Sequence, residues 1–197
     1  MARGKSLINN ISYMAITTTN INTKGATVTI GGTVNSVDVD GYYVGTTGGT
    51  DVGCTQGGVT VSYSFETKDI FCDQTLPAVE SSIISETATI NFEMLESDAD
   101  NLQLAIQQCE YTEDAGVSNK IGIGGITAIT YVPLMLEILD NDTSYTTTWT
   151  FFRCLSGGME TNFERENPTA ISVTFTAYAD TSHASGHQLF SVSESLA

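Results

Sequence analysis

Two histidines stand four residues apart near the C-terminus, in the run HASGH (His183 and His187). On a helix, this spacing would place both imidazoles on one face, as a zinc site requires. Here Ser185 and Gly186 stand between them, and no run of cysteines or carboxylates follows. The stretch therefore favours a turn, and we expect no metal site at these histidines.

A second pattern imitates part of a calcium-binding loop, with Ser36, Asp38, Asp40 and Gly41 in order. Such a loop begins with Asp and ends, at its twelfth position, with a Glu that supplies two oxygens. This chain has Ser36 at the first position and Thr47 at the twelfth, and strand patterns rather than helices flank the segment. Calcium binding is therefore not expected.

Patterns for catalysis and for cofactor binding are equally weak. The runs GIGGI and GTTGG lack the strand-to-helix context of a dinucleotide fingerprint and the lysine of a phosphate-binding loop, and no G-x-S-x-G elbow occurs. Glu86, Glu93 and Glu96 could pair as acid and base, but solvated acids on a strand are far more common. We predict no catalytic residue, no metal and no cofactor, and keep a small β-barrel hydrolase as the weakest alternative.

The charge balance limits the partners of the chain. Its formal net charge is −16, with only seven lysines and arginines, of which Arg3 and Lys5 lie in the N-terminal tail. Proteins grip nucleic acid by neutralising phosphates with such bases, and they attach to anionic membranes in the same way. Tight DNA or membrane binding is therefore disfavoured, whereas a surface that lets DNA pass without holding it is allowed.

Targeting signals and disulfides are not apparent in the sequence. The first ten residues lack the apolar stretch of a signal peptide, and no run of apolar residues is long enough for a membrane anchor. The four cysteines, Cys54, Cys72, Cys109 and Cys154, are far apart. In a chain made in the cytoplasm this favours free, partly buried thiols.

The clearest structural signal lies in residues 78–110, where a strand is followed by a helix. From residue 84 to 94 a largely apolar set alternates with polar residues, which indicates a strand with one buried and one solvated face. The apolar set is Ile84, Ala88, Ile90, Phe92 and Met94, and the polar set is Ser85, Thr87, Thr89, Asn91 and Glu93. Ser97, Asp98 and Asp100 then supply a helix N-cap and an acidic first turn, with Ser97 and Asp100 as a weak capping box.

Further alternating segments bring the prediction to about eight strands with one packed helix, in a single domain of 197 residues. They lie at residues 27–34, 59–66, 132–138, 145–151, 171–180 and 189–192, with short strands at 11–17 and 70–72. Pro133 predicts an edge strand or a bulge, and residues 111–120 and 157–167 are expected to be loops. The fold class is mainly β, a β-sandwich or half-barrel.

Two segments without periodicity could reach other subunits. Residues 1–10 look like an N-terminal arm. Residues 40–58 are rich in glycine and threonine, and a segment of about twenty such residues is long for a loop in a compact domain. One interpretation is a surface loop with its own small apolar cluster, and the other is an arm that becomes ordered on a neighbouring subunit.

Several stretches of the sequence also resemble one family. The runs DVGCTQGGVTVSYSFETKDIFCDQTLPAV and ETATINFEMLESDADNLQLAI are similar to the middle of tailed-bacteriophage tail tube proteins (major tail proteins). The run NPTAISVTFTAYADTSHASGHQLFSV resembles the closing strands of that family. Together these runs cover roughly half of the chain, and their order and spacing carry the resemblance more than any single motif.

The resemblance implies a structural virion protein with no enzymatic activity, assembled in the host cytoplasm and located in the phage tail. Its subunits would form stacked hexameric rings through which DNA passes into the host. The 40–58 loop would grip the next ring, with Tyr42, Tyr43, Val44, Gly48 and Gly49 as its candidate contacts. Implied partners are other copies of the chain, the tape-measure protein, the tail tip or baseplate proteins, a terminator and, in contractile tails, a sheath.

Reasoning from the residues adds a candidate for the inner wall of such a tube. Thr87, Thr89, Asn91 and Glu93 form a polar strand face without a single base, so it offers phosphates no partner. The same face could instead be the solvated outer side of an ordinary sandwich. The alternative function is therefore a monomeric β-sandwich that binds a ligand or decorates a virion, with Tyr42, Tyr43 and Trp149 exposed on one face.

Overall fold

The computed structural model describes residues 25–35, 45–114, 118–126, 128–139, 145–163 and 169–196. Within these ranges the chain is mainly antiparallel β-structure with one short helix, so the predicted fold class is confirmed. The predicted strand at residues 11–17 and the N-terminal arm, with Arg3 and Lys5, lie outside the described residues. So do Tyr42, Tyr43 and Val44, and the partial calcium pattern from Ser36 to Gly41.

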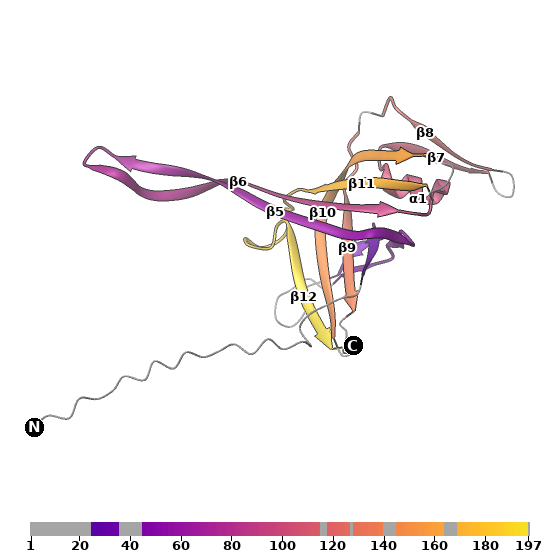
Figure 1. Cartoon of the computed structure of the whole chain (residues 1–197), viewed down its shortest axis with the longest axis horizontal. Helices are drawn as coiled ribbons and strands as arrows, with labels where there is room; N and C mark the ends of the chain where they lie inside the picture. The colour runs from indigo at the N-terminus through magenta and orange to yellow at the C-terminus, as the bar shows by residue number, and fades with distance from the viewer. Residues whose placement is uncertain are drawn as a thin grey trace, which may run out of the picture.

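One large sheet organises the described residues (Figure 1). Its strands follow the order β4 (Thr50–Asp51), β1 (Ala26–Ile30), β9 (Val132–Leu139), β10 (Tyr145–Asn162), β11 (Ala170–Ala177), β6 (Thr75–Met94) and β5 (Thr55–Cys72), and β12 (Phe190–Leu196) also pairs with β10. Two small pairs stand apart from it, β2 (Thr33–Val34) with β3 (Thr46–Thr47), and β7 (Cys109–Asp114) with β8 (Ser118–Ile123).

Strand β10 divides this sheet into two halves. Its first part pairs with β9 and β12, and its second part pairs with β11. Within the second part, the β10–β11 register shifts between Ser156 and Met159, where Gly158 has a φ of 110°, and a bulge of this kind bends a strand. In Figure 1, β5, β6 and β11 run across the direction of β9, β10 and β12, so the two halves of the sheet cross one another.

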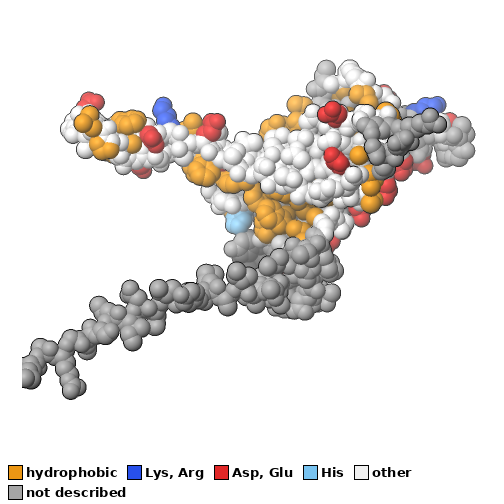
Figure 2. All heavy atoms as spheres, in the orientation of Figure 1, with side chains coloured by type: hydrophobic (Ala, Val, Ile, Leu, Met, Phe, Trp, Pro, Cys, Tyr) orange, Lys and Arg blue, Asp and Glu red, His pale blue; other side chains and the backbone are white. Residues whose placement is uncertain are grey.

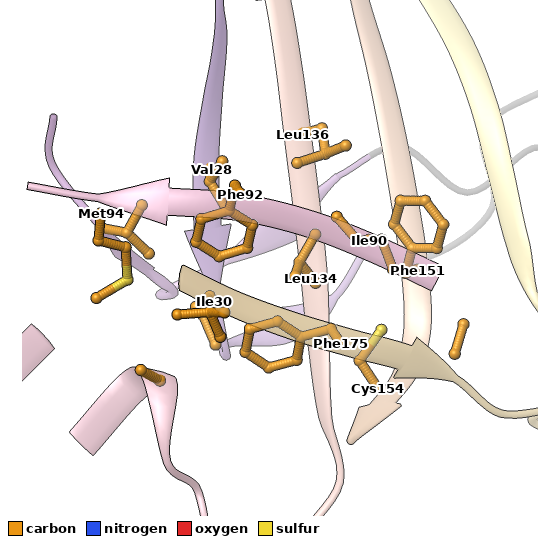
Figure 3. Close-up of a cluster of buried hydrophobic side chains, with 14 of the residues drawn as sticks. Val28, Ile30, Ile90, Phe92, Met94, Leu134, Leu136, Phe151, Cys154 and Phe175 are labelled. Carbon is orange, nitrogen blue, oxygen red and sulfur yellow. The ribbon is translucent and has the colours of Figure 1, made fainter. Parts of the chain in front are cut away.

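The core lies between the two halves (Figure 3). From one side, Ile90, Phe92 and Phe175 point inward, and the rings of Phe92 and Phe175 stack with their centroids 6.0 Å apart. The facing side chains come from β1, β9 and β10, namely Val28, Ile30, Leu134, Leu136, Phe151 and Cys154. The alternation along residues 88–94 is thus confirmed as a buried strand face.

The helix α1 (Ala99–Ala105) closes one end of this core. Its N-cap is Asp98, whose carboxylate accepts a hydrogen bond from the backbone N–H of Asn101 at 2.8 Å. The predicted capping box between Ser97 and Asp100 is therefore wrong, because the helix begins one residue later. Ala105 is buried, and its carbonyl accepts a hydrogen bond from the hydroxyl of Ser156 on β10.

Pro133 does not mark an edge strand, because β9 lies inside the sheet between β1 and β10. The alternative prediction, a bulge, is confirmed. Phe151 pairs with Leu134. Cys154 pairs with Val132, which leaves two residues of β10 opposite Pro133. The proline thus stands where the ladder is already interrupted and its missing N–H costs no hydrogen bond.

Two segments predicted as loops are strands instead, and the short strand predicted at residues 70–72 is part of a much longer one. Residues 111–120 lie mostly in the β7–β8 hairpin, and β10 continues through Gly157 and Gly158 to Asn162. Strands β5 and β6 run on without a break to a two-residue turn at Asp73 and Gln74. Most of these residues are exposed, so no apolar alternation distinguishes them from loops in the sequence.

The β5–β6 hairpin extends well beyond the body of the molecule (Figure 1). We call its outer part, residues 65–86, the projecting hairpin. Ile84, predicted as the first buried residue of its strand, is 59% exposed because β6 has not yet reached the body at that point. A register shift between Glu66 and Thr67 places Ile84 in a bulge.

Candidate functional surface: a polar sheet face and a projecting hairpin

The outer side of β5, β6 and β11 is a continuous surface of hydroxyl and amide groups. Because paired residues of neighbouring strands share one face, the register assembles rows such as Thr60, Asn91 and Thr174. We call this surface the polar face; its members are Gln56, Thr60, Ser62 and Ser64 of β5, Thr87, Thr89, Asn91 and Glu93 of β6, and Ser172, Thr174 and Thr176 of β11.

The structure therefore brings together the four residues proposed for an inner wall, Thr87, Thr89, Asn91 and Glu93, and extends them over two more strands. Thr174 donates a hydrogen bond from its hydroxyl to Asn91 Oδ1 at 2.7 Å across the β6–β11 pair. The three outward residues of β11 are part of a strand that the sequence predicts, but their position beside β6 follows only from the sheet order.

Glu93 carries the only charge on the polar face. No lysine or arginine belongs to it, so DNA phosphates would find no cationic partner there. The first base along β5 is Lys68 on the projecting hairpin, which is four residues, or roughly 13 Å, beyond Ser64. The polar face can hydrogen-bond to water over its whole width without binding a polyanion.

The outer side of the other half of the sheet is covered in part. Thr146, Thr148 and Thr150 of β10 point away from the core and are nevertheless buried. The backbone N–H of Gly45 donates to Thr150 Oγ1 at 2.9 Å, and that of Thr46 lies 3.3 Å from the sulfur of Met135. This side is thus closed along β10, although Glu137 of β9 is exposed on it.

The described part of the 40–58 segment lies against the sheet of its own subunit. β4 pairs with β1, and the buried Val52 donates its N–H to the carbonyl of Val28 at 3.0 Å. A Cβ on Gly49 would stand 2.6 Å from Thr29 Cγ2 and 2.8 Å from the carbonyl of Gly31, so only glycine fits. Gly48, beside it, is exposed. The inter-ring role of this segment stays a prediction.

The projecting hairpin exposes an unusual number of large apolar side chains (Figure 2). At its tip Leu76 is 98% exposed and Phe71 67%. Val79, Ile70, Ile83 and Ile84 are also exposed along its length. Sequence reasoning missed this surface, although two apolar segments that flank a short polar turn were a signal for an exposed hairpin.

A groove lies at the base of the hairpin, between β5, β6 and the segment that joins β11 to β12. It has a volume of about 820 Å³. Tyr63 and Phe190 line it, with their rings edge to face at 5.9 Å. The hydroxyl of Tyr63 donates to Glu86 at 2.8 Å, and this bond to a carboxylate raises the pKa of Tyr63 above its ordinary value.

The residues that could have done chemistry are not gathered into one site. His183 and His187 lie in turns, as predicted. The ring of His183 packs against Phe152 at 4.1 Å with a tilt of 35°, and its Nε2 stands 3.7 Å from Asp180. Glu86 bonds to Tyr63, whereas Glu96 accepts the N–H of Cys54 at 3.1 Å. Within the described ranges, no cluster of three metal-ligating side chains occurs.

The helix of the described residues is neither long nor apolar enough to span a membrane. The four cysteines are free thiols: Cys54 is exposed, Cys72 and Cys109 are half-buried, and Cys154 is buried. Burial raises the pKa of Cys154 far above that of an ordinary thiol.

No protein-family model and no curated protein matches the chain. Among solved structures, a chain of one described as "Virion of native gene transfer agent (GTA) particle" is similar to it at 10% sequence identity. The likeness covers 88% of this chain and 98% of that chain, with a TM-score of 0.44. A score this low does not establish a shared fold.

Proposed function

We propose that this chain is a structural virion subunit whose copies join through the projecting hairpin into the tube of a phage tail. The observation that carries this proposal is the hairpin itself: within the described part of the chain its outer residues pair only with each other, and they expose apolar side chains on a protein of net charge −16. A protein that works as a monomer would have no use for an apolar hairpin that is exposed to water.

Physical chemistry favours a partner for the hairpin. A two-stranded hairpin without a third strand or a packing surface is marginally stable in water, and exposed apolar strands are sites of association. Burying Phe71, Leu76 and Val79 would contribute about 2 kcal/mol each, or about 6 kcal/mol in total, before the costs of association. This gain supports a specific contact between subunits.

The polar face fits the wall of a conduit. Its hydroxyls and amides hold water, and Glu93 adds a negative charge that repels phosphates within a Debye length of about 8 Å at physiological salt. In the proposed assembly, Thr87, Thr89, Asn91 and Glu93 line a bore through which DNA slides. The free edge of β5 pairs with a neighbouring subunit, since ring closure removes unpaired edges.

The finer features of the proposal come from the sequence resemblance. They are hexameric stacked rings, contacts from the N-terminal arm (Arg3, Lys5) and from the 40–58 loop, and assembly in the host cytoplasm. The partners are the tape-measure, tip or baseplate and terminator proteins, with a sheath in contractile tails. The protein has no enzymatic role in this scheme.

The rival function, a monomeric binding or decoration module, needs aromatic groups on an exposed face. Of its three candidates, Trp149 is half-buried and stacks on Phe190 at 5.8 Å. It is therefore part of the packing between β10 and β12, which removes one of the side chains on which that function depends.

The experiment that tests the proposal replaces the apolar tip of the hairpin. In the triple variant Phe71→Ser, Leu76→Ser, Val79→Ser, we expect a folded protein that stays monomeric in sedimentation velocity, while the unaltered chain forms rings or hollow rods in negative-stain micrographs. The matched control is Ile123→Ser, Ile126→Ser, Ile129→Ser, which removes three exposed apolar side chains from another surface. Rods from the tip variant would overturn the proposal.

A further inference from the structure

The groove at the base of the projecting hairpin has the chemistry to hold the tip of another hairpin. Tyr63, Tyr178, Ala179 and Phe190 give its wall aromatic and aliphatic groups, beside polar groups from residues such as Glu86, Ser185 and Gln188. Its volume of about 820 Å³ lies within the range of about 300–1,000 Å³ of pockets that enclose most of a drug-sized ligand. Two or three side chains of the hairpin tip are of that size.

We propose that this groove receives the tip of the projecting hairpin, around Phe71 and Leu76, from a second copy of the chain. The inference rests on the proposed function, since it specifies where the hairpin of that assembly docks. The proposed function requires only that the hairpin contacts another subunit, and the groove is the surface that we propose for this contact.

The hairpin cannot fill the groove of its own subunit. Tyr63 and Glu86 line the groove at the base of the hairpin, and Cys72 ends β5 nine residues after Tyr63. At about 3.3 Å per residue, the tip stands roughly 30 Å from the groove. A paired ribbon of this length does not fold back on itself, so the occupant must come from another molecule.

Charge does not hold this contact together. Lys68 is the only base on the projecting hairpin, which also carries Glu66, Asp69, Asp73, Glu80 and Glu86, and Glu86 is the only carboxylate among the residues that line the groove. The attraction we propose is therefore between the apolar side chains of the tip and the aromatic groups of the groove, and added salt should strengthen it by screening the carboxylates.

This contact joins two different patches of the same chain. Each subunit donates one hairpin and offers one groove, so the interface is head-to-tail. Interfaces of this type give closed rings when the rotation between subunits closes and open helical filaments when it does not. The geometry of one subunit thus already favours an extended assembly.

The first test fills the groove. We expect Ala179→Trp, at an exposed position on the groove wall, to weaken self-association about a hundredfold, a loss typical of blocking a central interface contact. Ala128→Trp, the same substitution at an exposed position away from the groove, should leave association unchanged. Full assembly of the Ala179→Trp protein would overturn the groove as the docking site.

The second test uses disulfide cross-links between two variants, both made with Cys54→Ser and Cys72→Ser to remove accessible thiols. One carries Leu76→Cys at the tip and the other Ser185→Cys in the groove. If tip and groove meet, their effective concentration is in the millimolar range, so mild oxidation should link them about a hundredfold faster than free chains. Thr60→Cys on the polar face is the control partner for Leu76→Cys.

The outcomes separate the two proposals. Linked tip and groove cysteines in the assembled protein support the docking site. If the protein assembles but Leu76→Cys links to Thr60→Cys, or does not link to Ser185→Cys, the groove is not the docking site. The proposed function is unaffected by that result. A protein with no assembly at any concentration or salt overturns the proposed function, and the groove with it.

Discussion

Neighbouring residues of β11 serve opposite purposes. Phe175 is fully buried and stacks on Phe92, whereas Thr174, one residue before it, is exposed on the polar face and bonds to Asn91. The apolar residues of the alternating pattern thus pack in the core and stabilise the subunit, whereas the polar residues form its surface. Substitutions at the two positions should separate stability from function.

We expect Phe175→Ala to lower the free energy of unfolding by about 3–5 kcal/mol, because the cavity left between the sheet halves cannot collapse fully. Thr174→Ala removes an exposed hydrogen bond and should cost no more than about 1 kcal/mol. Urea denaturation followed by circular dichroism measures both. A small effect of Phe175→Ala would mean that the two halves of the sheet do not pack as described.

At the scale of elements, the sequence predicts those strands that have one buried face. Ala88, Ile90, Phe92 and Met94 alternate because β6 packs on the core there. The first part of β6, which includes Ile84, lies in the projecting hairpin outside the body. There the alternation of apolar and polar residues no longer predicts which side chains are buried. The projecting hairpin was predicted only in part, as a short strand at residues 70–72, and the β7–β8 pair was predicted as a loop, because strands solvated on both faces carry no periodicity.

The order of the strands in the sheet could not be predicted from the sequence either. Periodicity predicts a face but not a neighbour, so the polar residues of β6 were found, while their union with Thr60 of β5 and Thr174 of β11 was not. Pro133 shows the same limit, because a bulge in the middle of the sheet and an edge strand relieve a proline equally well.

The start of the helix provides a prediction at this scale. Asp98→Ala removes the carboxylate that accepts the Asn101 N–H, and we expect a loss of about 1 kcal/mol in the free energy of unfolding. Ser97→Ala, one position earlier, lies outside the cap and should change it by less than about 0.5 kcal/mol. Equal losses in chemical denaturation would show that the cap is shared and that the helix begins earlier.

For the whole molecule, the bent sheet yields two outer surfaces of different character. One is covered around Gly45 and Thr150, and the other, the polar face, is open and free of bases. The proposed tube requires of its subunit both a side that packs against other protein and a side that meets DNA without holding it. The net charge of −16 adds repulsion between free subunits, so added salt should favour assembly by screening it.

A matched pair of charge reversals tests which surface faces the bore. Glu93 lies on the polar face, and Glu137 of β9 is exposed on the outer side of the other half of the sheet. In particles assembled from Glu93→Lys subunits, a ring of lysines would line the bore and bind phosphates, so DNA should leave more slowly and with a stronger dependence on salt. Glu137→Lys makes the same change in charge and should leave the rate of DNA release unaltered.

The release of DNA is timed by the fluorescence of a dye that binds emerging DNA. If only Glu137→Lys slows release, the bore is lined by the other side of the sheet, and if neither does, DNA does not pass along these surfaces.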